Sequence, residues 1–180
     1  SGDGFRLMWV PQFERLDEPF EIQDGIVIPA GDYRYTAWIA EVETAQRRRW
    51  VAQVEARWGS FYDGDLTRLE AELVLKPSPH LLVAAEGEWS RGELPAGSFT
   101  AKVLAGRLEV NFTPNLGWSN LVQYDTDSRE LGLQSRLRWR VRPGSDLFVV
   151  INRGWVREED GAYRRYFDRG SAKVQHTFRW

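Results

Sequence analysis

The sequence predicts an all-β fold, an antiparallel transmembrane β-barrel of about ten strands with short periplasmic turns and longer extracellular loops. Three observations lead to this prediction. Apolar and polar residues alternate with a period of two in segment after segment, as in strands with one apolar and one polar face. The turns alternate between short proline-centred ones and more polar ones. The chain also holds nine tryptophans, a residue that concentrates at membrane interfaces.

Composition excludes several other classes of protein. No apolar run approaches the ~18 residues of a membrane helix, which excludes a helical membrane protein. A mean hydropathy of -0.49 is compatible with a barrel, because half of the strand residues of a barrel face a polar interior. A net charge of -2 argues against a nucleic-acid partner. With no cysteine and no metal-ligand spacing, we expect neither a cofactor nor a metal site.

The expected strands follow one another along the whole chain, 1–180, as a single barrel or as the C-terminal sector of a larger one. Pro11 places the first strand at an edge or a bulge. The loop 16–31 carries an apolar stretch at 26–28, which either folds inward or adds a strand. Residues 147–151 are apolar at both parities, which indicates cover on both faces. In order, we expect strands at roughly 5–13, 32–43, 48–62, 65–76, 80–90, 98–112, 117–125, 129–141, 146–156 and 170–180.

The turns set the orientation. Proline-centred connections at 76–80, 113–117 and 142–146 are suited to tight hairpins and are expected on the periplasmic side, together with both termini. The polar connections, at 63–64, 90–98, 125–129 and 156–170, are then expected outside the cell.

The last eleven residues alternate strictly and end on Phe178 and Trp180. This ending is typical of the closing strand of a barrel, and we expect it to act as the signal read by the outer-membrane assembly machinery. The localisation predicted from it is the bacterial outer membrane, and the predicted partners are the lipid bilayer and lipopolysaccharide. The opening Ser-Gly-Asp-Gly, without a leader, is expected of a processed or excised piece.

Aromatic residues on the apolar parity are expected near both strand ends, at the membrane interfaces. A soluble β-sandwich or lipocalin-like barrel is the alternative, with these rings inside, but the charged opposite face argues against it. The expected interface residues are Trp50, Trp58, Trp89, Phe112, Trp118, Trp139 and Trp155.

Charged residues on the other parity are expected to line the lumen. They either interlock and plug a small barrel or line a wet channel in a wider one. The arginines at 136, 138 and 140 are expected to have carboxylates close by, such as Glu109. The expected lumen residues are Glu55, Arg57, Arg68, Glu70, Glu72, Glu86, Glu88, Arg107, Glu109, Arg136, Arg138 and Arg140.

Catalytic chemistry is not predicted. His80 falls in a turn and His176 has the apolar parity, so no Ser-His-Asp arrangement is indicated and we expect no enzyme. The acidic pairs at 63/65 and 125/127 either form turns or bind Ca²⁺. Arginines around the loop 156–170 are either solvated or meet lipid phosphates.

Eight motifs in order along the chain carry a resemblance. They are FERLDEPF (13–20), IPAGDY (28–33), FYDG (61–64), FTPN (112–115), LVQYD (121–125), LRW (137–139), RPGSDLF (142–148) and TFRW (177–180). Together they resemble the C-terminal barrel region of a bacterial outer-membrane family of unknown function whose members carry an N-terminal domain similar to family 9 carbohydrate-binding modules. The resemblance implies an outer-membrane barrel, with no activity or catalytic residues to carry over. Its usual ending is Phe-Arg-Phe, from which Trp180 departs.

The function expected from these residues is a channel or transport pore with a charged lumen, because the inward face is continuously polar. The alternative is a non-conducting membrane anchor that holds a carbohydrate-binding module in the parent protein. A third expectation is an outer-membrane hydrolase, which lacks a histidine on the lumen side.

Overall fold

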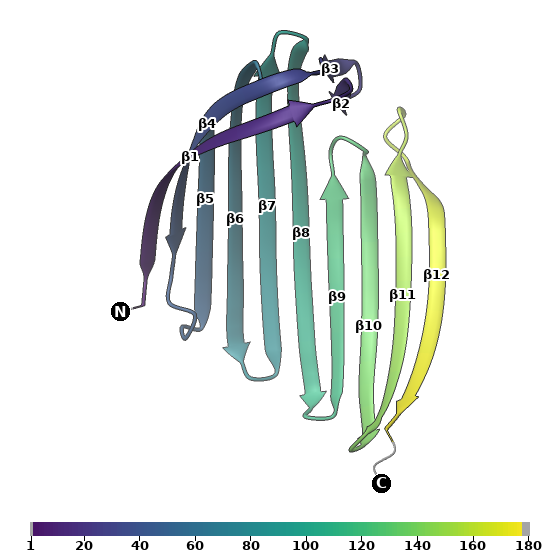
Figure 1. Cartoon of the computed structure of the whole chain (residues 1–180). Coiled ribbons are helices and arrows are strands. Elements are labelled where there is room, and N and C mark those ends of the chain that lie inside the picture. Colours follow the sequence, from purple (N-terminus) through teal and green to yellow (C-terminus); the bar gives the residue numbers. More distant parts are fainter. Residues whose placement is uncertain (1, 178–180) are drawn as a thin grey trace. The chain divides into compact units, whose positions relative to one another are not determined.

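The computed structural model describes residues 2–177, and over this range it consists of strands, turns and loops without a helix. The strands are β1 (Gly4–Leu16), β2 (Phe20–Gln23), β3 (Ile26–Ile28), β4 (Gly31–Glu43), β5 (Trp50–Phe61), β6 (Gly64–Ser78), β7 (Leu81–Leu94), β8 (Gly97–Thr113), β9 (Leu116–Asp125), β10 (Glu130–Arg142), β11 (Ser145–Arg157) and β12 (Tyr163–His176) (Figure 1).

Ten of these strands form one sheet in the order β1-β4-β5-β6-β7-β8-β9-β10-β11-β12, and β2 pairs with β3 in a separate hairpin. The all-β, antiparallel prediction is therefore confirmed. Pro11 lies in β1, at an end of the strand order, as a residue without an amide donor requires. Within residues 2–177 no pairing joins β1 to β12, so what is shown is an antiparallel sheet and not a closed barrel.

Two of the loops were predicted too long. The predicted loop 90–98 shrinks to residues 95–96, and the predicted loop 156–170 shrinks to 158–162. In both places the strands continue through the polar residues, whose side chains contact one another within a strand or across two strands, and β12 stays paired with β11 as far as Tyr163 opposite Arg157. Arg91 pairs with Glu93 at 2.7 Å, and Arg153 pairs with Asp168 at 3.4 Å. Polarity without periodicity was therefore a poor indicator of a loop.

The expected difference in turn length between the two ends of the strands is also only partly correct. The proline-centred connections are tight, at 79–80, 114–115 and 143–144. Two connections at the opposite end, 62–63 and 95–96, are equally short, whereas the connection 44–49 lies on the supposedly short side. At that opposite end, therefore, the loop that contains β2 and β3 is clearly longer than the proline-centred turns, and the connections 126–129 and 158–162 are slightly longer.

The chain divides into two compact units. Unit 1 comprises Ser1–Arg47, Val51–Glu72 and Gly87–Lys102, and unit 2 comprises Arg48–Trp50, Leu73–Glu86 and Val103–Trp180. In unit 1 the register places Trp9 opposite Trp38 and Trp38 opposite Trp58. These three rings form a row on one face and are 57%, 43% and 40% exposed. Unit 1 therefore presents an apolar face whose large side chains are not covered by protein.

The other face of unit 1 is polar. Arg6 is paired with Glu41 across β1 and β4, and Glu41 is paired with Glu55 across β4 and β5, so the three side chains share one face. The alternation expected of a two-faced sheet is thus present in the register as well as in the sequence.

Unit 2 is built in the same way. On one face Leu133 lies opposite Val122, and Leu137 lies opposite Trp118. On the other face Arg136 lies opposite Ser119, and Arg138 lies opposite Gly117. Exposed apolar side chains of this unit include Leu104, Phe112, Trp118, Val122, Trp139, Val141, Ile151 and Val174.

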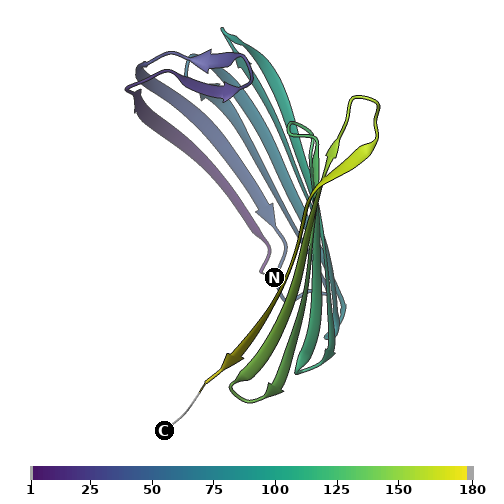
Figure 2. The same ribbon diagram turned by 90° about the vertical axis from the view of Figure 1, so that its right-hand side faces the viewer.

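The hairpin of β2 and β3 provides the one hydrophobic core cluster of the described residues. Ile28, only 1% exposed, packs with Ile26 and with Leu94 at the end of β7. Partly buried side chains around them come from β1, β2, β4, β5, the turn after β5, and β8, namely Leu16, Ile22, Tyr33, Phe61, Tyr62 and Phe99. Figure 2 shows the hairpin turned back over the loop ends of these strands. Residues 16–31 therefore both fold back onto side chains of the neighbouring strands and form two short strands of their own.

Gly92 makes room for this packing. A Cβ at this position would lie 2.2 Å from Cε1 of Phe99, so the Phe99 ring occupies the space that a side chain would take. The glycine in β7 is thus explained by the close approach of an aromatic ring. Nowhere in residues 2–177 does a helix reach the length and apolarity needed to cross a membrane.

Candidate functional site

The polar face of unit 1 contains six of the residues expected in the lumen, and several of them contact one another. Arg68 on β6 lies 3.3 Å from Glu88 on β7 and 3.6 Å from Glu70 on its own strand. Ser90 accepts a hydrogen bond from Arg68 and donates one to Glu88. Arg57 donates to the side chain of Gln12. Glu55 and Glu72 complete the six, and Glu55 lies opposite Glu41.

The polar face of unit 2 carries the arginine ladder. Arg138 donates to Asp146 at 3.1 Å, and Arg140 lies 3.6 Å from the same carboxylate. The expected partner Glu109 instead lies 3.8 Å from Arg107 on its own strand. The prediction of the partner was therefore wrong. The sequence reading assigned Asp146 to a turn, whereas the tight connection 143–144 sets it directly across from Arg140. Glu86, the remaining expected residue, lies in the part of β7 that belongs to unit 2.

Phe148 explains the apolar run of β11. The guanidinium carbon of Arg136 lies 4.9 Å from the centroid of the Phe148 ring, and that of Arg138 lies 5.7 Å from it. Cations at this distance are attracted to the face of an aromatic ring. The expected cover of residues 147–151 on the polar face is thus supplied, at Phe148, by arginine side chains.

A phenol–carboxylate cluster lies beneath the hairpin in unit 1. Tyr35 and Tyr62 both donate to Oε2 of Glu14, each at 3.0 Å. The rings pack on one another, with centroids 5.3 Å apart, and Tyr33 and Phe61 meet Tyr62 edge-on. Sequence reasoning missed this cluster. Its signal was the concentration of aromatic residues at 33, 35, 61 and 62, at the loop ends of two neighbouring strands.

Tyr62 sits in the turn after β5 with a φ of 51°, the left-handed region that few side chains adopt. Burial disfavours its phenolate, and the hydrogen bond to Glu14 and the charge of that carboxylate add to the effect, so the pKa of Tyr62 is raised well above its ordinary value. The Tyr62 phenol therefore keeps its proton, and its hydrogen bond to Glu14, well above the neutral range.

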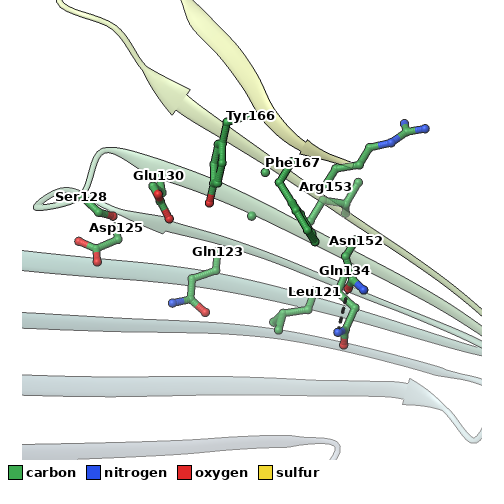
Figure 3. A pocket seen from close by; sticks show the side chains of 13 residues that line it. Leu121, Gln123, Asp125, Ser128, Glu130, Gln134, Asn152, Arg153, Tyr166 and Phe167 are labelled. Carbon is green, nitrogen blue, oxygen red and sulfur yellow. Dashed lines mark hydrogen bonds between the residues drawn. The ribbon is translucent and has the colours of Figure 1, made fainter. Parts of the chain in front are cut away.

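A groove of about 420 Å³ opens at the loop ends of β9–β12 in unit 2 (Figure 3). Tyr166 and Phe167 of β12 point over it, and Gln134 donates to Asn152 at 3.0 Å along its wall. A Cβ on Gly154 would lie 2.9 Å from the ring of Tyr166, so this glycine leaves the space in which the ring lies. Amides, aromatic rings and the carboxylates of Asp125 and Glu130 line the groove.

The two histidines lie away from this groove. Nδ1 of His80 is 2.9 Å from the carbonyl oxygen of Asn111, and Nδ1 of His176 is 2.6 Å from Oγ of Ser145. Among residues 2–177 no three histidine or carboxylate side chains gather as a metal site would require. Asp125 acts as a turn former, because its Oδ1 accepts the amide of Asp127 at 2.8 Å.

The arginines around the last loop are largely paired with protein carboxylates. Arg164 contacts Glu158, while Arg153 and Arg165 contact Asp168 at 3.4 and 3.0 Å.

The expected interface aromatics lie on the apolar faces. Trp58, Trp118, Trp139 and Trp155 are placed there by the register, and Trp50, Trp89 and Phe112 by the alternation of their strands. Trp89 and Trp155 are half-buried, and the others are exposed. Trp9 and Trp38 belong to the same set and were missed, although both have apolar-face parity in the sequence. The expected assembly signal, Phe178 and Trp180, lies outside the described residues.

Comparison with protein-family models, with curated proteins and with solved structures finds no match for this chain.

Proposed function

We propose that the chain forms an outer-membrane β-barrel, or a sector of one, that conducts solutes along a charged lumen. The observation that carries the proposal is the two-faced construction of each unit. One face holds uncovered tryptophan, leucine and valine side chains, and the other holds ion pairs. Exposed apolar surface on this scale is typical of contact with lipid or with another protein.

The length of the apolar face supports lipid as its environment. On β10 it runs from Leu131 to Val141, ten steps of about 3.3 Å, or roughly 25 Å along a membrane normal at a strand tilt near 40°. This matches the ~25 Å apolar band of outer-membrane barrels. In unit 1 the same face becomes charged at the loop end, where Arg15 and Asp32 are 2.6 Å apart. The apolar surface of unit 1 therefore ends before the loop ends of β1 and β4.

A second candidate function is a non-conducting membrane anchor. The observation that favours it is the hairpin of β2 and β3, which packs over the polar face at the loop end of unit 1 through Ile26 and Ile28. An apolar cluster on a polar face narrows whatever passage that face lines.

Lipid contact can be tested with the tryptophans. We expect the folded chain in vesicles to lose most of its tryptophan fluorescence to lipids brominated on their acyl chains, and little of it to aqueous acrylamide. A chain that stays monomeric without detergent and is quenched only by acrylamide would contradict the membrane proposal.

Planar-bilayer recording separates the pore from the anchor. We expect open current from the folded chain, and a larger current when the double variant Ile26→Ser, Ile28→Ser loosens the hairpin. The control is Val27→Ser, because Val27 lies between them and is exposed. Silence from both the folded chain and the double variant would overturn the pore and leave the anchor.

A further inference from the structure

We infer that the polar face of β10–β12 binds multiply charged anions, phosphate or carboxylate in chemistry, and that the pore therefore favours anionic solutes. The second half of this inference rests on the proposed function, whereas the binding site itself does not. Cationic side chains are in local excess around Phe148.

The register brings these cations together on three neighbouring strands. Phe148 on β11 lies between Arg138 on β10 and Lys173 on β12, and Asn152 lies opposite Arg169. Neighbouring strands are ~4.8 Å apart, so Arg138 and Lys173 start only about 10 Å from each other. Along β10 the arginines at 136, 138 and 140 repeat every ~6.6 Å.

Among the described residues, one carboxylate contacts the arginines of this patch. Asp146 is 3.0 Å from Nη2 of Arg138 and 3.6 Å from Nε of Arg140. Within the described part of the chain, Arg136, Arg169 and Lys173 have no carboxylate within ion-pair distance. Arg136 lies over Phe148, and Arg169 lies over the ring of Phe167 at 5.8 Å.

Unpaired cations this close together repel one another, and a mobile anion relieves that repulsion. Arginine offers two parallel N–H donors to a phosphate or carboxylate, and lysine adds a point charge. Polar, uncharged neighbours such as Ser171 and Gln175 lie on the same face of β12. The patch therefore fits a ligand that carries several acidic groups, rather than a single small anion.

Isothermal titration of the detergent-folded chain with inorganic tripolyphosphate tests the site. We expect binding at about 50 mM salt that weakens steeply by about 200 mM, as for contacts that release counterions. Lys173→Gln and Arg136→Gln should each weaken binding roughly tenfold. The matched control is Arg153→Gln, which removes a cation of the same unit from the opposite face and leaves Asp168 with Arg165.

Arg136→Lys guards against a folding artefact, because it keeps the charge over Phe148 and should retain most of the binding. Absence of tripolyphosphate binding by the unchanged chain, or an equal loss in Arg153→Gln, would overturn the site. The charge selectivity of the pore is measured separately, as the reversal potential of the planar-bilayer current under a salt gradient. If the chain binds tripolyphosphate but carries no current, the anion site is supported and the pore is contradicted. If the chain does not bind tripolyphosphate and its current is cation-selective, the anion inference is contradicted and the pore is supported.

Discussion

Asn120 shows what a single residue can do on the apolar face of unit 2. It lies opposite Ser135 and Leu108, and its amide nitrogen is buried without a hydrogen-bond partner among the described residues. Ser135 itself already accepts from Nε1 of Trp118 at 2.9 Å. A buried donor left without an acceptor is destabilising, because it has lost its contact with water.

Replacing Asn120 with Leu should therefore raise the free energy of unfolding by about 1–2 kcal/mol. Urea titration of the chain folded in vesicles measures it. The matched control is Asn152→Leu, which should destabilise the chain, since Asn152 accepts a hydrogen bond from Gln134. A loss of stability in Asn120→Leu would indicate that the amide has a partner in the assembled protein.

Tyr62 gives a prediction for pH. Its pKa is raised above the ordinary value of 10.0, so the folded state keeps the proton after the unfolded state has released it. The stabilisation is complete below pH 10 and is lost progressively as the pH rises above it. We expect the stability of Tyr62→Phe to fall less steeply above pH 10 than that of the unchanged chain. An equal slope for Tyr62→Phe and the unchanged chain would contradict this role of the Tyr62 phenol.

At the scale of elements, the hairpin of β2 and β3 depends on the fit of Phe99 over Gly92. Gly92→Ala would place a methyl group 2.2 Å from the Phe99 ring. Because the ring must move, we expect a loss of about 1–3 kcal/mol. Gly106→Ala is the control, since its Cβ would meet nothing within 4 Å. That change should be neutral or stabilising by up to ~1 kcal/mol. Equal effects of the two substitutions would contradict the packing described.

The strands were predictable from the sequence because alternation is a local property. Each of the ten main strands falls within a few residues of its expected bounds, except the start of β12 at Tyr163. There Arg164, Arg165 and Asp168 suggested a loop, but β12 stays paired with β11 through these residues, with Arg164 opposite Val156 and Asp168 opposite Arg153. The charge of a residue alone does not indicate whether it lies in a strand or in a loop.

The candidate site was predictable only in part, for a related reason. Parity assigned the arginines at 136, 138 and 140 to one face, but the partner Asp146 follows from register, which the turn 143–144 sets. The Glu14 cluster depends on contacts between residues 48 apart in the chain, Glu14 and Tyr62. No local pattern contains that pairing.

At the scale of the molecule, β1 and β12 stand at the two ends of the strand order. β1 and β12 each pair on one side only among the described residues, and every residue of β12 is exposed. An unpaired strand edge is a template for another strand. In a closed barrel β1 and β12 would pair with each other, and in a sector of a larger barrel each would pair with further strands.

Cysteine cross-linking tests this pairing, because the chain contains no native cysteine. A cysteine at Val10 on β1, combined in turn with one at Ala172, Lys173 or Val174 on β12, should form an intramolecular disulfide at one register, where the Cα atoms come within about 5.5 Å. Ser119 on β9 serves as the control position. If the folded chain forms intermolecular disulfides and no intramolecular one at any of the three registers, closure of β1 on β12 is excluded.

The separate pairing of β2 with β3 also affects dynamics. Among the described residues, no ladder of backbone hydrogen bonds ties this hairpin to the ten-stranded sheet, and side-chain packing around Ile28 helps to hold it there. Such a segment opens as its own cooperative unit, at a lower free energy than the sheet. Hydrogen exchange should therefore show the amides of 20–28 exchanging together, well before those of β4 or β5, while both neighbours keep their protection. The hairpin is the part of the molecule that can move without unzipping a strand.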